Sequence, residues 1–136
     1  MILSAEQVPA KVFRVIQADG RRVHVMDFAR VDIGVDGRID AQPGPLTLRQ
    51  GTRLVVLDVV VKGTEVHVLT HTADPVPTTG GPPAVYGCTE FVFHLDPTVL
   101  ATGPFEPVFQ TIERWLEWTP ALRWCAPGIH PICFEP

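Results

Sequence analysis

The sequence predicts a mainly β (α+β) domain: a small antiparallel barrel or strongly curled meander of six to seven short strands, one C-terminal amphipathic helix and an extended tail. Three observations predict it. The 136 residues include 14 prolines and 11 glycines, so regular elements must be short and often interrupted. Several segments alternate apolar and polar side chains with the period of two that is typical of strands. No strand–helix–strand repeat occurs, which argues against a parallel α/β sheet.

Length and composition indicate one folded domain. A chain of this size buries roughly 68% of its unfolded surface, enough for a core of its own. The hydrophobic fraction of 46% and the charged fraction of 19% are those of an ordinary folded protein. The formal net charge is −4 and only two lysines are present, so we expect no nucleic-acid partner. Residues 1–13 lack a secretion signal and no apolar run could span a bilayer, so we expect a soluble, cytoplasmic protein without a membrane partner.

The segment 46–72 is predicted to be the centre of the sheet. Residues 54–61 are almost all apolar and mostly branched, which favours a strand covered on both faces and therefore a central one. A turn at 62–65 and an alternating run at 66–72 complete a β-hairpin. We interpret this hairpin as scaffold rather than as a functional site.

Two Asp-Gly dipeptides, at 19–20 and 36–37, predict tight turns because this pair tolerates the positive φ angles of two-residue hairpin loops. The first would join strands at 11–17 and 22–28. The second would join a strand at 30–35 to a short return strand. The N-terminal third is therefore predicted to be two hairpins.

Proline and glycine mark two breaks in the chain. Two prolines and one glycine at 41–45 exclude that segment from the interior of a ladder. The segment 73–87 holds four prolines and three glycines and is long for an ordered loop. Loops of that length are often functional or flexible, so this one is a candidate lid.

A last strand is predicted at 88–95, and a helix at about 105–118 follows it. Pro107 suits the first turn of a helix, where its missing N–H costs nothing. The apolar side chains of this helix fall on one arc. We expect a barrel body at about 8–96 and a tail, 119–136, packed on that body because it carries large apolar residues.

The tail contains Cys125, His130 and Cys133, which are zinc-ligand types, and Cys88 or His94 could complete a set of four. The seven-residue spacing of the two tail cysteines matches no zinc pattern, however. We therefore favour packed thiols, expect no metal or cofactor, and keep these five residues as weak metal candidates. A disulfide between Cys125 and Cys133 is sterically feasible but unusual in a reducing compartment.

A Cys-dependent active site has little support from spacing. On a strand, Cys88, Glu90 and His94 share one face, and successive members of such a face are about 6.6 Å apart. Cys88 and His94 would then lie beyond hydrogen-bond reach of each other. We assign no catalytic residue, although a partner from elsewhere in the chain stays open.

Polar residues interrupt the hairpin at Asp58, His67 and His71. The two histidines would be about 13 Å apart along a strand, too far for a shared metal ion. With His24 and His94 they could form one titrating face, but we favour scattered, half-exposed histidines. For Asp58 we favour an outward position, a bulge or pairing with an arginine over a buried acid.

Three functions remain open after these observations. We favour a non-catalytic protein-interaction or accessory module, with self-association as a homodimer and with Trp118 and Trp124 as interface candidates. A second is a small-molecule or lipid-binding barrel in which 73–87 forms a lid. A third is a small Cys/His enzyme or metal-binding protein. The loop 73–87 and the tail are the predicted places for function.

Overall fold

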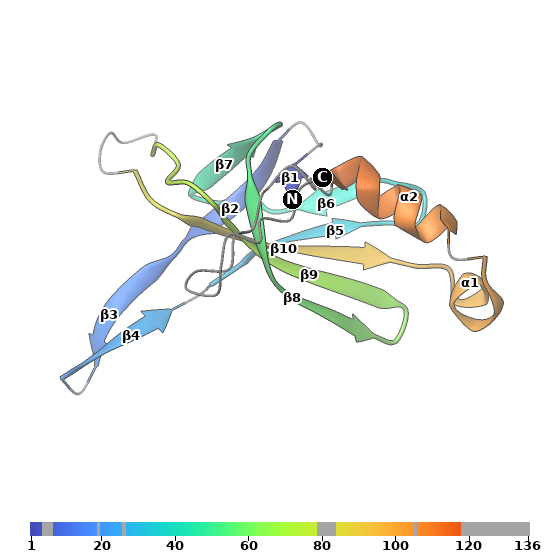
Figure 1. Ribbon diagram of the computed structural model, residues 1–136, viewed down its shortest axis with the longest axis horizontal. Helices are drawn as coiled ribbons and strands as arrows, with labels where there is room; N and C mark the ends of the chain where they lie inside the picture. The colour runs from blue at the N-terminus through green and yellow to red at the C-terminus, as the bar shows by residue number, and fades with distance from the viewer. Residues whose placement is uncertain (4–6, 19, 26, 79–83, 105, 118–136) are drawn as a thin grey trace, which may run out of the picture.

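The structure is a computed structural model that describes residues 1–3, 7–18, 20–25, 27–78, 84–104 and 106–117, with the backbone only at 14–18 and 22–25. The described residues form short strands and two helices (Figure 1). The strands are β1 Ile2–Leu3, β2 Gln7–Val12, β3 Arg14–Ala18, β4 Arg21–Val25, β5 Ala29–Ile33, β6 Ile39–Ala41, β7 Leu46–Arg49, β8 Leu54–Lys62, β9 Glu65–Thr72, β10 Gly87–His94 and β11 Leu116–Glu117. The helices are α1 Pro97–Thr102 and α2 Glu106–Trp115.

Seven of the strands form one strongly curled sheet, a half-barrel built around β10. Along one side β10 pairs antiparallel with β9, which pairs with β8. Along the other side β10 pairs first with β2 and then with β5, which lead outward to β7 and β6 respectively. The β3–β4 hairpin projects from this body, and β1 pairs with β11 (Figure 1). The predicted fold class is confirmed.

The core lies on the concave side of this sheet. Phe91 and Phe93 of β10 are fully buried there with Val31 and Ile33 of β5. Leucines of β1, β7, β8 and β11 join the same cluster, and α2 packs Val108, Ile112 and Trp115 against it. The predicted amphipathic helix is therefore present and covers part of the core.

The pairing differs from the prediction in two respects. β5 runs parallel to β10, whereas sequential antiparallel strands were expected. β8 is not central, because among the described strands it pairs with β9 alone. The central strand is β10, in which every residue is buried or half-buried. Long-range pairing decides which apolar strand occupies the centre, and the composition of one segment does not encode it.

The helices also differ in detail. The sequence predicts only the end of a strand at Asp96-Pro97, but α1 begins there. The Asp96 carboxylate accepts a hydrogen bond from the Thr98 N–H at 2.8 Å, and Pro97 occupies the first turn. The second helix is shorter than the predicted 105–118. Neither described helix is long and apolar enough to cross a membrane.

Candidate functional site

The outer edge of β8 is the most unusual surface of the described structure. The hairpin closes with Lys62 opposite Glu65 around a two-residue loop, whose Gly63 has the positive φ of 57° that such loops require. The pair next to a two-residue loop exchanges main-chain hydrogen bonds, and the pattern then alternates along the strand. The main-chain groups of Lys62 and Val60 therefore face β9, and those of Val61 and Val59 face away from it.

A side-chain contact supports this assignment. The Val59 N–H donates to the Oδ1 of Asp58 at 2.8 Å instead of entering the ladder. Asp58 itself is exposed and lies next to a register shift between Val56 and Asp58. The prediction of an outward or bulged Asp58 is thus confirmed. Its carboxylate caps one of the outward amides of the edge.

Apolar side chains are exposed along the same edge. Val59 is 54% exposed and Val61 is 64% exposed, and Val55 and Leu57 are exposed as well. Natural edge strands are usually short, covered or rich in charge, because open backbone groups attract further strands. β8 is nine residues long and carries only Asp58 and Lys62 as charges. This edge therefore has the properties of a strand-pairing surface, which in Figure 1 lies on the outer side of the β8–β9 hairpin.

Two histidines of the neighbouring strands take part in an ion-pair network on the face opposite the core. His67 of β9 is only 5% exposed, and its Nε2 lies 2.8 Å from the Oε2 of Glu65. Its Nδ1 lies 3.3 Å from the Oε2 of Glu90 on β10. The ring therefore bridges two carboxylates and ties β9 to β10. The expectation of half-exposed histidines is wrong for His67.

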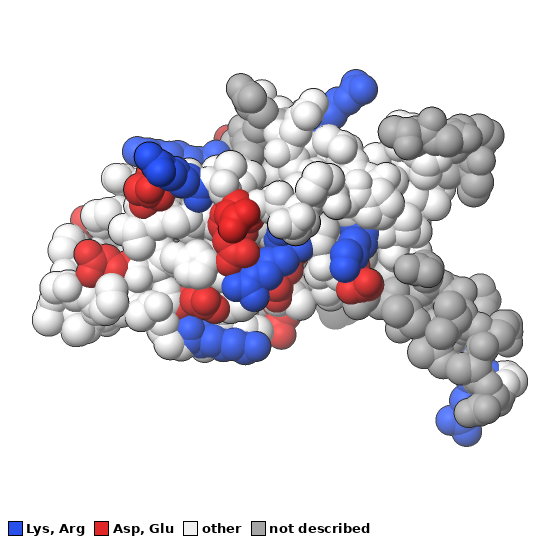
Figure 2. Space-filling view, turned by 180° about the vertical axis from the view of Figure 1, so that it is seen from behind, with Lys and Arg blue, Asp and Glu red and all other residues white. Residues whose placement is uncertain are grey.

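The network continues from β10 to β5. The His94 Nε2 lies 2.7 Å from the Asp32 Oδ1, and its Nδ1 lies 3.7 Å from Glu65. Arg30 donates to both oxygens of Asp32, at 2.9 Å each. The hydrogen bonds from Arg30, and then the contact with His94, hold the pKa of Asp32 below its usual value although burial opposes the shift. Figure 2 shows acidic and basic side chains interleaved across the middle of the molecule's rear face.

The network joins strands β5, β9 and β10 and resembles a structural ion-pair network more than an active site. Every carboxylate in it already contacts a cation or an imidazole, so none is left open toward a substrate. Within the part of the chain that the structure describes, no three His, Cys, Asp or Glu side chains are arranged to hold a metal ion. His71 lies apart, with its Nδ1 2.7 Å from the carbonyl oxygen of Thr72. The side chain of His24 lies outside the described atoms.

The remaining Cys and His candidates are only partly described. Cys88 is buried in β10, and burial raises the pKa of its thiol, with a smaller contribution from the Asp27 carboxylate. It shares one face of β10 with His94, whose imidazole is engaged by Asp32. Cys125, His130 and Cys133 lie outside the described residues, as do the interface candidates Trp118 and Trp124.

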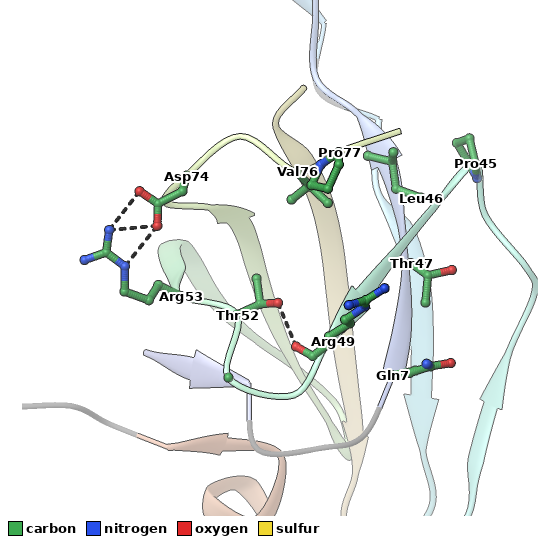
Figure 3. Close-up of a pocket in the computed structure, with 11 residues that line it drawn as sticks. Gln7, Pro45, Leu46, Thr47, Arg49, Thr52, Arg53, Asp74, Val76 and Pro77 are labelled. Atoms are coloured by element: carbon green, nitrogen blue, oxygen red, sulfur yellow. Dashed lines mark hydrogen bonds and ion pairs between the residues drawn. The ribbon is translucent and has the colours of Figure 1, made fainter. Parts of the chain in front are cut away.

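A depression of about 820 Å³ lies between β7 and residues 74–77 of the predicted lid (Figure 3). Leu46, Val76 and Pro77 supply apolar lining. In the close-up Arg49 lies between Thr47 and Thr52, whereas Arg53 reaches away to Asp74. The Arg53–Asp74 pair is bidentate, with Nε and Nη2 each donating to a carboxylate oxygen at 3.0 Å or less. The guanidinium of Arg49 forms no such pair with any described residue.

Comparison of the chain with protein-family models, with curated proteins and with solved structures finds no match in any of the three. The sequence did not reveal Glu65, Glu90 and Asp32 as partners of the histidines, or Arg30 as the partner of Asp32. Their period-two placement along single strands was visible, but the register that joins the strands was not.

Proposed function

We propose that this protein is a non-catalytic interaction module that binds an extended segment of a protein partner along the outer edge of β8. One observation carries the proposal: β8 pairs with β9 along one side, whereas on its other side only its first residue, Leu54, bonds to a described main-chain group, that of Met1. Apolar side chains are exposed along the rest of this strand. Addition of a strand to such an edge is a common mode of peptide recognition, in which main-chain hydrogen bonds provide affinity.

Energetics supports the same surface. Full burial of a valine side chain stabilises a complex by about 1.5–3 kcal/mol before the costs of association. Val59 and Val61 are exposed in the free chain and would both be covered by an added strand. The main-chain N–H and C=O groups of these residues face away from β9, so they would form hydrogen bonds with the added strand at the same time.

The ion-pair network supports a rigid platform behind this edge. It joins β9 to β10 through His67 and β10 to β5 through His94 and Asp32. A hairpin held in this way loses little conformational freedom when a partner binds. An interaction role is also favoured over a Cys-dependent activity, because burial disfavours the Cys88 thiolate and His94 is already bound.

Photo-cross-linking tests the proposal. Benzoylphenylalanine replaces Val59 in the full chain, and a control replaces Val35, whose 63% exposure lies elsewhere, between β5 and β6. We expect a light-dependent protein adduct from position 59 and none from position 35. Val61→Pro in the first variant should abolish the adduct, because it removes an outward N–H without touching the bonds to β9. No adduct from position 59, or an adduct that survives Val61→Pro, would overturn the proposal.

The depression beside β7 supports a second function, binding of a small molecule with an apolar body and an anionic group. Arg49 supplies a cation next to the apolar lining of Leu46 and Val76, and the volume is in the range of ligand sites. Octanoate is a suitable probe. It should shift the amide resonances of Thr47 and Thr52, and Arg49→Gln should weaken binding about tenfold while Arg21→Gln does not. Absence of binding, or equal binding by Arg49→Gln, would exclude this function.

A further inference from the structure

The two charges of β8 indicate what its partner is. Building on the proposed function, we propose that the added strand is β8 of a second copy of this chain, antiparallel and centred on Val60. The copies would be related by a two-fold axis that passes between their Val60 residues. Three features of the strand favour this dimer: the direction of its main-chain groups, the spacing of its charges and its exposed valines.

The main-chain groups restrict the register. The outward N–H and C=O groups belong to Val59 and Val61, and in an antiparallel ladder outward groups must face outward groups. A two-fold centred on Val60 sets Val59 opposite Val61 of the second copy. Each then donates its N–H to the carbonyl of the other, and the symmetric pair does the same.

The charges select this register among those that the backbone permits. With Val60 at the centre, Asp58 lies directly opposite Lys62 of the second copy, and Lys62 lies opposite Asp58 of that copy. Both are positions without mutual main-chain bonds, where opposing side chains approach most closely. A register centred on Asp58 would instead set two carboxylates against each other. One centred on Val59 would leave Asp58 opposite Val60.

The Val59 N–H and the Asp58 carboxylate each have a partner both before and after association. In the free chain Asp58 binds the Val59 N–H, and Lys62 forms no ion pair with any residue that the structure describes. In the dimer the carbonyl of the second copy's Val61 takes over that N–H, which releases the Asp58 carboxylate for Lys62. Association is therefore an exchange of contacts.

The exposed valines add the apolar part of the interface. Val59 and Val61 lie opposite Val68 and Val66 of β9 and project on the same face of the hairpin. In the dimer the Val59 and Val61 side chains of both copies would pack together across the new ladder. The paired segment is short, 58–62 in each copy, so we expect a reversible dimer with a dissociation constant on the order of micromolar.

Charge exchange tests the inference in the full-length chain. Sedimentation equilibrium from micromolar to millimolar concentration should show a monomer–dimer equilibrium. Asp58→Lys and Lys62→Glu each set like charges against each other twice, so each should raise the dissociation constant at least about tenfold. Both positions are exposed, so folding should be retained. An equal mixture of the two variants should recover dimerisation, because the charges at 58 and 62 are again opposite across the axis. The double variant in one chain should recover it too.

The possible results distinguish a wrong partner from a wrong function. A monomer at all concentrations that still yields an adduct with a different protein from position 59 would overturn the second copy and leave the proposed function standing. A dimer that both single variants leave unchanged would overturn the register. Stronger association of Asp58→Lys would show that Asp58 only guards the edge, and would also overturn the inference. Loss of both the dimer and the adduct would remove the inference together with the proposed function.

Discussion

β10 and β8 are two apolar strands of similar length with opposite fates in the sheet. β10 has eight residues, pairs along both of its sides and is almost wholly buried. β8 has nine residues, pairs among the described strands with β9 alone, and leaves four large apolar side chains exposed. Only its first residue, Leu54, also bonds to Met1. An apolar run therefore indicates that a strand is buried, but not which part of the structure buries it. β10 is buried by other strands of this chain, and for β8 we propose burial against a second copy.

The largest expected effect is the loss of an aromatic ring from β10. Phe91 is fully buried at the centre of the core. Phe91→Ala should lower the free energy of unfolding by about 3–5 kcal/mol, through lost burial and the cavity that remains. Urea denaturation followed by circular dichroism measures it. A loss below about 1 kcal/mol would mean that β10 is not the centre of the fold.

A matched pair of valines tests the contrast between the strands directly. Val92 of β10 is fully buried and Val61 of β8 is 64% exposed. Val92→Ala should cost about 2 kcal/mol, whereas Val61→Ala should change stability by less than about 0.5 kcal/mol. The denaturations must be done at low protein concentration, because association would stabilise the native chain. Equal costs would contradict the assignment of β8 as an open edge.

A smaller effect concerns the ion-pair network that joins β5, β9 and β10. The pKa of Asp32 is lowered in the folded chain, so its contribution is present above its unfolded pKa of about 3.9 and is lost as the pH falls through the lower folded value. Asp32→Asn should therefore reduce stability by up to about 1 kcal/mol at pH 7, and the difference from the unaltered chain should shrink below about pH 4.

Asp40 offers a control for that measurement. It lies opposite Asp32 on β6 and forms no ion pair with a described residue. Asp40→Asn should not lower stability, because it removes a neighbouring negative charge and no attraction. If both variants lose stability equally at pH 7, the ion pair of Asp32 with Arg30 is not the cause.

Local features of the fold could be predicted from the sequence. Gly20 and Gly37, both with positive φ, lie between the strand pairs β3–β4 and β5–β6, as the Asp-Gly turns predicted. The β8–β9 hairpin and the alternation of β10 were also predicted, since they depend on nearest neighbours along the chain. The helix cap at Asp96 could also have been predicted, because an Asp-Pro pair followed by an apolar run is a common start of helices.

Non-local features could not be predicted. Gly87 illustrates why: a β-carbon there would lie 3.0 Å from that of Ala10, 77 positions earlier in the chain, so the start of β10 depends on a contact with β2 that no local pattern encodes. The parallel β5–β10 pair and the network around His67 also depend on contacts between residues far apart in the sequence, so they could not be predicted either. The same dependence on long-range contacts led us to interpret the hairpin as scaffold, although its edge is now the candidate site.

The measurement that tests the central claim most directly is amide hydrogen exchange of Val60 and Val61 as the protein concentration is raised. In dilute solution the Val60 amide, bonded to β9, should exchange slowly, and the Val61 amide, facing outward, should exchange fast. At high concentration Val61 should become protected while Val60 changes little. A Val61 amide that is already protected in dilute solution, or that stays unprotected at every concentration, would contradict the account.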